Sequence, residues 1–118
     1  MLRHYEKRRY VAILYDETHL YKPFQLHEIM VKRFKELFGV IHCELAMLRL
    51  YDSEFGNILF IGCKLKYLDN FLFSLSMNQP PVVVISLSGT LKKLRKNVSA
   101  LNLETLKTIE TKYEKGMR

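Results

Sequence analysis

One short segment of the sequence combines small, hydroxyl-bearing and basic residues at helical spacing. A turn of serine, glycine and threonine leads into a helix whose Leu91, Leu94 and Val98 share one face. The first amides of a helix lack partners and its dipole favours anions, so a phosphate group would fit beside the cations of the other face. The candidate phosphate ligands are Ser88, Gly89, Thr90, Lys92, Lys93, Arg95 and Lys96. The alternative is an ordinary solvated helix face with a Ser/Thr cap.

Two further groups of cations occur elsewhere. Arg3, Lys7, Arg8 and Arg9 precede the first predicted strand, and Lys32, Arg33 and Lys35 lie on the first predicted helix. Basic arms bind phosphates, but they also serve as solubilising ends. With 19 Lys and Arg against 12 Asp and Glu, the chain carries a net charge of +7. That surplus favours a polyanionic partner, either nucleic acid or an anionic membrane surface.

Catalytic and metal-binding patterns do not stand out. His4, His19, His27 and His42 have no metal-ligand spacing, and Cys43 and Cys63 do not accompany them. The two cysteines are predicted to be buried, reduced thiols on adjacent strands. An acylphosphatase would need an arginine-bearing phosphate loop after the first strand, where this chain has Asp16-Glu17. We therefore expect no catalytic apparatus and no cofactor or metal bound by the protein.

The longest apolar run, from Pro80 to Ile85, is far shorter than the ~20 residues of a spanning helix. The N-terminus also lacks the apolar core of a secretory signal. The sequence thus predicts an intracellular protein of 118 residues without a membrane segment. Its length is that of one domain, spanning residues 1–118.

Hydrophobic periodicity predicts alternating strands and helices. Strands are expected over Tyr10–Tyr15, Val40–Tyr51, Ile58–Cys63 and Val82–Ile85, the last as a fully buried strand. Helices are expected from Lys22-Pro23 to Gly39, over Lys64–Met77, from Ser88 onward, and again from Asn102. The order β-α-β-β-α-β predicts an α+β, ferredoxin-like (RRM-like) sandwich with two extra C-terminal helices. Its core would span residues 8–87 and the C-terminal helices residues 90–115.

The first and third strands are apolar on both sides, since Tyr10, Ala12 and Leu14 alternate with other apolar residues. A sheet with one wet face would alternate apolar with polar residues. We therefore expect the second face to be covered by the C-terminal helices, by a protein partner, or by both.

Aromatic residues on the sheet offer a different hypothesis. Tyr10 and Phe60 could stack unpaired bases, as the sheet aromatics of an RRM do. The stretch Gly56–Ile61 matches the RRM strand signature poorly, however, and aromatics at strand spacing are usually core or partner contacts.

Four segments together resemble a known family, the ribonuclease P and ribonuclease MRP proteins called "processing of precursors" subunit five and their fourteen-kilodalton paralogue. The similarity covers about residues 7 to 97. Its segments are Arg8–Ile13, Leu37–Gly39, Leu48–Ile61 across the hairpin, and Ser88–Lys93 after the last strand. The final segment is the most specific, because the family shows a Ser/Gly-Gly-Thr-aliphatic-basic run in that place. The chain departs from some animal members in lacking a long acidic tail.

The resemblance implies an RNA-binding, non-catalytic subunit of a ribonucleoprotein. In that family the RNA subunit, with its Mg²⁺, removes 5′ leaders from precursor tRNA, and the protein stabilises the fold of that RNA. The implied partners are the ribonuclease P or MRP RNA, a TIM-barrel-like thirty-kilodalton protein, precursor tRNA indirectly, and a paralogue or second copy. Arg8 and Arg9 would join the turn and helix at 88–96 as the RNA surface. The implied location is the nucleus and nucleolus in a eukaryote, or the cytoplasm in an archaeon.

Overall fold

The computed structural model describes residues 7–16 and 21–101. The elements in chain order are β1 (Arg8–Leu14), α1 (Pro23–Phe38), α2 (Val40–Ala46), β2 (Arg49–Tyr51), β3 (Ile58–Lys64), the short 3₁₀ helix η1 (Leu65–Tyr67), α3 (Leu68–Ser76) and β4 (Val83–Ser88). A further helix occupies residues 91–101. The helix predicted from Asn102 lies outside the described residues.

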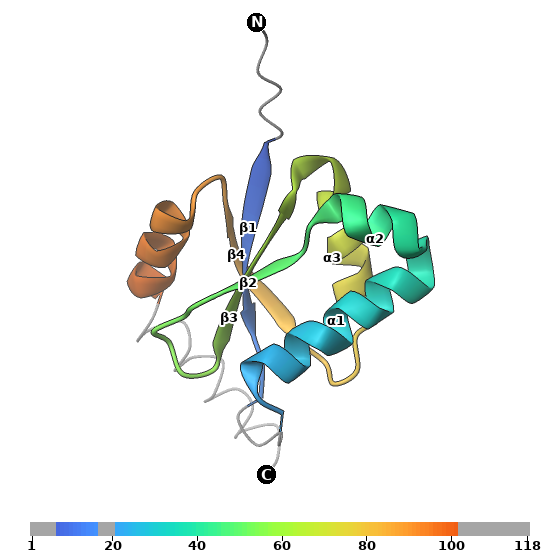
Figure 1. Ribbon diagram of the computed structural model, residues 1–118. Coiled ribbons are helices and arrows are strands. Elements are labelled where there is room, and N and C mark those ends of the chain that lie inside the picture. The colour runs from blue at the N-terminus through green and yellow to red at the C-terminus, as the bar shows by residue number, and fades with distance from the viewer. Residues whose placement is uncertain (1–6, 17–20, 102–118) are drawn as a thin grey trace, which may run out of the picture.

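The four strands form one antiparallel sheet in the order β2-β3-β1-β4. Helices α1, α2 and α3 lie on one side of it, and helix 91–101 lies on the other (Figure 1). This is the predicted ferredoxin-like α+β arrangement, in which two crossovers and one hairpin build a sheet backed by helices. No helix in the described part of the chain is long and apolar enough to cross a membrane.

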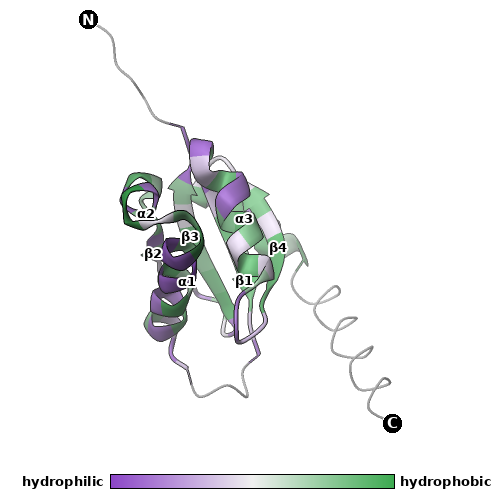
Figure 2. Cartoon of the chain, turned by 90° about the vertical axis from the view of Figure 1, so that its right-hand side faces the viewer, coloured by the Kyte–Doolittle hydropathy of each residue, from purple (hydrophilic) through white to green (hydrophobic). Residues whose placement is uncertain are grey.

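The first core lies between the sheet and α1 to α3. Pro23 occupies the first turn of α1, where its missing N–H removes no hydrogen bond, and the helix then buries Leu26, Met30 and Phe34. These side chains pack with Val11, Ile13, Leu59, Ile61, Phe71 and Leu75. Figure 2 shows β1 and β4 predominantly in the hydrophobic colour.

The second core explains why the strands are apolar on both sides. Leu94 and Val98 of helix 91–101 are buried against Ala12, Ile58 and Phe60 on the opposite face of the sheet. Within the described residues, part of the expected cover is therefore supplied by the chain's own C-terminal region.

The prediction of a strand over Val40–Tyr51 was wrong for its first half. Gly39 has a positive φ of 93°, which ends α1 and lets the chain turn directly into α2. Cys43 and Ala46 are spaced for a helix and are buried toward α1, so only Arg49–Tyr51 joins the sheet. A continuous apolar run does not distinguish a short helix from a strand. Cys43 therefore lies on a helix and not on a strand next to Cys63.

The prediction of a fully buried last strand was also wrong. β4 pairs with β1 alone and forms one edge of the sheet. Val83 is 55% exposed, and Val84 and Leu87 are exposed as well. A β-branched run predicts a strand, but its position in the sheet depends on the crossovers.

Candidate nucleic-acid interface

The sheet topology gathers cations from distant parts of the sequence at one end. β1 and β2 begin there, whereas β3 and β4 end there, because neighbouring strands are antiparallel. Arg8 is paired with Lys64, Arg49 with Gly62, and Tyr10 with Ser88. We call this region the basic end; its residues are Lys7, Arg8, Arg9, Arg49, Lys64, Lys66, Lys92 and Lys93. It lies where β1 starts in Figure 1.

Arg9 joins the first predicted cluster to the second. A methyl group added at Gly89 would lie 3.7 Å from Arg9 Nη1 and 4.0 Å from Arg9 Cζ, so the guanidinium lies beside the Ser88-Gly89-Thr90 turn. Arg9 Nη1 also donates a hydrogen bond to the Arg8 carbonyl oxygen at 2.9 Å. Two groups that are some eighty positions apart in the sequence thus form one surface.

Arg8 is directed into the protein. Its Nη2 donates to the Met47 carbonyl oxygen at 3.2 Å and lies 3.5 Å from the Tyr51 hydroxyl. A methyl group added at Gly62 would lie 2.8 Å from Tyr51 Cε2 and 3.1 Å from both Arg8 Nη2 and Tyr10 Cδ1. Only glycine leaves room for these three side chains, and Arg8 ties the start of β1 to the segment before β2.

The turn after β4 is held by its own side chains. The Thr90 hydroxyl accepts a hydrogen bond from the Lys93 amide at 3.1 Å, which is an N-cap interaction. The Ser88 hydroxyl accepts a weaker bond from the Thr90 amide at 3.4 Å, and Ser88 is only 7% exposed. The sequence predicted that the first backbone amides of the helix are unpaired. The Lys93 amide is paired, since it donates to the Thr90 hydroxyl. Gly89, Thr90, Lys92, Lys93 and Lys96 are exposed.

Arg95 faces away from the basic end. Its Nε lies 3.4 Å from Glu54 Oε1, and its Nη2 donates to the Asp52 carbonyl oxygen at 3.0 Å. Its guanidinium also lies over the Phe60 ring, 5.7 Å from the centroid. Arg95 therefore fastens helix 91–101 to the β2–β3 connection.

The sheet aromatics are not arranged for base stacking. Phe60 is 0% exposed beneath helix 91–101. Tyr10 is partly buried, and its ring meets that of Tyr51 edge to face with centroids 5.5 Å apart. The predicted platform of Tyr10 and Phe60 is thus closed in this structure.

Sequence reasoning did not single out Arg49, Lys64 or Lys66. None of them lies in a run of cations. The strand register brings Arg49 and Lys64 to the end of the sheet where Arg8 and Arg9 lie, and Lys66 follows on η1 directly after β3. Arg49 and Lys66 are exposed. The strand order, once predicted, was the signal that could have found them.

Burial disfavours the thiolate form of both cysteines. Burial raises the pKa of Cys63 to about 11, against a smaller opposing effect of Arg8. Burial also raises the pKa of Cys43. Both are free and buried, as predicted. The described residues contain no cluster of His, Cys, Asp and Glu that could hold a metal ion.

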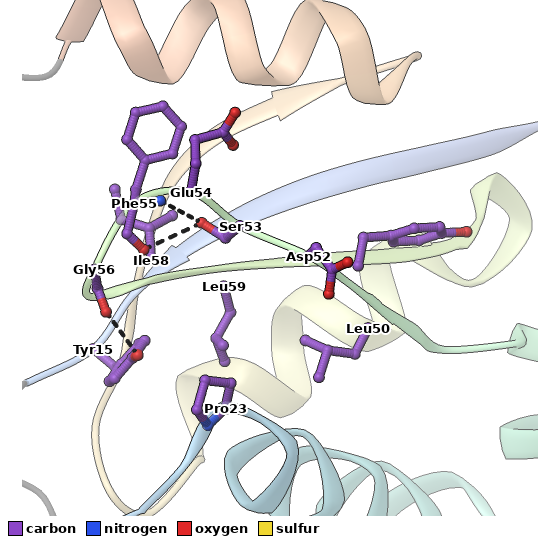
Figure 3. A pocket seen from close by; sticks show the side chains of 11 residues that line it. Tyr15, Pro23, Leu50, Asp52, Ser53, Glu54, Phe55, Gly56, Ile58 and Leu59 are labelled. Atoms are coloured by element: carbon purple, nitrogen blue, oxygen red, sulfur yellow. Dashed lines mark hydrogen bonds between the residues drawn. The ribbon is translucent and has the colours of Figure 1, made fainter.

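A pocket of about 360 Å³ lies between the β2–β3 connection and the start of α1 (Figure 3). Its floor includes Pro23, Leu50 and Leu59, while Asp52 and Glu54 are its charged residues. Within the connection, the Ser53 hydroxyl bonds both the amide and the carbonyl oxygen of Phe55. Since none of the lining residues is a cation, this pocket is a poor match to a phosphate ligand.

The fold of the chain is similar to that of one chain in a solved structure. Over 93% of its length it matches 99% of one chain in the cryo-EM structure of yeast ribonuclease MRP, with a TM-score of 0.54 and 12% sequence identity. No protein-family model and no curated protein sequence matches the chain. At this identity the likeness establishes a shared fold.

Proposed function

We propose that this chain is an RNA-binding, non-catalytic subunit of a ribonucleoprotein of the ribonuclease P and MRP kind. The observation that carries the proposal is the basic end, where the ends of four strands bring cations together on one surface. The fold shared with a chain of yeast ribonuclease MRP supports the same interpretation. The protein would stabilise a catalytic RNA that removes 5′ leaders from precursor tRNA, and Mg²⁺ would be bound by that RNA.

The mechanism is electrostatic. Each phosphate that a lysine or arginine neutralises releases counterions from the RNA, so the affinity falls linearly with salt on a logarithmic scale. Arg9, Lys92 and Lys93 supply charge around the Ser88-Gly89-Thr90 turn, while Arg8 holds the start of β1 in place. A rigid sheet keeps these groups in position before the RNA arrives, which lowers the entropy cost of binding.

A protein partner is part of the proposal. α2 exposes Val40, Ile41 and Leu45, and α3 exposes Phe73, all outside the basic end. Exposed apolar surface of this kind marks protein contacts. A TIM-barrel-like subunit, a paralogue or a second copy would cover it, in the nucleus and nucleolus of a eukaryote or the cytoplasm of an archaeon.

Charge reversal tests the RNA surface. Lys92→Glu with Lys96→Glu changes two exposed residues, so the fold is expected to persist. We expect weaker binding to the ribonuclease P RNA of the source cell in filter assays. The salt slope should also be smaller, by roughly 0.7–0.9 for each phosphate that the variant no longer neutralises.

The matched control is Lys32→Glu with Lys35→Glu, which makes the same change of charge at exposed positions of α1. This pair is expected to weaken binding much less. Equal losses in the two variants, or no loss in either, would contradict an RNA interface at the start of helix 91–101.

Base stacking on the sheet is the competing hypothesis. It requires Phe60 to be open, whereas the structure buries it beneath Leu94 and Val98. Binding of short single-stranded RNA that Phe60→Ala abolishes, in a protein that stays folded by circular dichroism, would restore that hypothesis.

A further inference from the structure

We infer that the basic end binds the phosphate backbone of double-helical RNA, by charge and shape, and does not read the bases of a single strand. This inference rests on the proposed function and specifies which form of RNA the surface takes. It also adds Arg49, Lys64 and Lys66 to the RNA-contacting residues.

The cations form a row on a rigid support. Neighbouring strands lie about 4.8 Å apart, so the ends of the four strands extend over about 14 Å. Along that row come Arg49 on β2, Lys64 on β3 and Arg9 on β1, followed by the turn after β4. Arg8 supports the row from within, through its hydrogen bond to the Met47 carbonyl oxygen. A duplex presents phosphates in fixed positions, so two rigid arrays meet with little ordering cost, whereas a flexible single strand must first be ordered.

The strands that end in this row carry no opposing charge. None of the four contains Asp or Glu. Asp16 follows β1 at the opposite end of the sheet, and Asp52 and Glu54 lie in the β2–β3 connection there. Among the other acids of the described residues, Glu44 and Asp69 are on α2 and α3, in the helical layer.

Among the described residues, the basic end offers little aromatic surface to an unpaired base. The Tyr10 and Tyr51 rings meet each other edge to face, and both lie against the backbone of Gly62. Phe60 is sealed. In the part of the chain that the structure describes, exposed Tyr21 precedes α1, Phe24 lies on α1 and Phe73 lies on α3, all away from the basic end. Proteins that bind single strands stack bases on open aromatic faces, while those that bind duplex RNA contact phosphates and sugars.

The test compares one RNA sequence in two forms. Fluorescence anisotropy with the full chain would measure binding to a short RNA duplex of more than one helical turn, to each of its separate strands, and to a duplex of unrelated sequence. We expect the two duplexes to bind equally and roughly ten-fold more tightly than either strand at the same salt concentration.

The decisive variant is Arg49→Glu with Lys66→Glu, since both side chains are exposed and neither belongs to helix 91–101. It is expected to weaken duplex binding by roughly ten-fold or more, whereas Lys32→Glu with Lys35→Glu has a much smaller effect. If only Lys32→Glu with Lys35→Glu lowered the affinity for the duplex, the assignment of Arg49 and Lys66 to the RNA surface would be overturned.

Other outcomes separate this inference from the proposed function. The duplex inference fails, and the proposed function stands, if the chain binds the ribonuclease P RNA but single strands displace that RNA better than duplex does. The same conclusion follows if Tyr10→Ala removes RNA binding without unfolding the protein. If the chain binds neither the ribonuclease P RNA nor any duplex, both fail.

Discussion

Adjacent arginines at the start of β1 have different surroundings because side chains alternate along a strand. Arg8 contacts Tyr51 and the Met47 carbonyl oxygen, and its Nε is buried without a hydrogen-bond partner among the described residues. Arg9 lies beside Gly89 at the rim of the sheet. Of the two, Arg9 is the better placed to contact RNA, and Arg8 supports the surface.

His27 is expected to make the stability of the protein depend on pH. It lies on α1, and its Nε2 is buried without a partner in the described residues. Burial lowers the pKa of His27 below the ordinary 6.5, although a backbone contact with Leu48 and the nearby Glu28 oppose the shift. The unfolded chain then binds a proton at a higher pH than the folded chain does, so acidification below about pH 6.5 favours unfolding.

We therefore expect the melting temperature to fall between about pH 7.5 and about pH 5.5, and to fall less in His27→Gln. Thermal denaturation followed by circular dichroism measures both. An equal fall in the two proteins would assign the pH dependence to other groups.

Helix 91–101 is an integral part of the fold and not an appendage. Thr90 caps it, Leu94 and Val98 fill the second core, and Arg95 fastens it to Asp52 and Glu54. Its burial of Phe60 is also what removes the stacking surface.

Leu94→Ala tests this role. Leu94 is 0% exposed, and truncating a buried leucine costs about 2–5 kcal/mol of unfolding free energy. Urea denaturation should show that loss, whereas Lys96→Ala at the exposed face should stay within about 0.5 kcal/mol of the wild type. A change below about 1 kcal/mol in Leu94→Ala would mean that the helix contributes little to the fold.

Hydrophobic periodicity predicted the elements with strong patterns. It failed where the same pattern fits both a helix and a strand. Alternating and helical spacings predicted the ends of β1, β3 and α1 with an error of at most two residues. The run after Gly39 suits a strand and a helix equally, and a positive φ at that glycine decided for α2. η1 separates β3 from α3, which starts at Leu68 and not at Lys64, because a short 3₁₀ turn has no sequence period of its own.

For the whole molecule, the candidate site depends on topology more than on any motif. The sequence alone shows basic clusters at residues 8–9 and 88–96. They come together at the basic end only because the strands have the order β2-β3-β1-β4. The strand register also brings Arg49 and Lys64 to that end, and Lys66 lies there on η1, directly after β3. Arg95 shows the converse, since its spacing suggested a phosphate ligand and its contacts serve the fold.

The bare edge of β4 is expected to make the isolated chain associate. Val83, Val84 and Leu87 are exposed along a six-residue strand whose outer side has no neighbour in the described sheet. Unprotected edges pair with other edges, and an edge lysine prevents this. Light scattering over a series of concentrations should show growth in mass for the wild type and less for Val83→Lys; a constant mass for the wild type would contradict this expectation.

The yield of soluble protein would then depend on stoichiometry. Copies of the chain made in excess of the partner that covers the β4 edge would precipitate or be degraded. Co-expression with that partner should therefore recover more soluble protein than a change of buffer does.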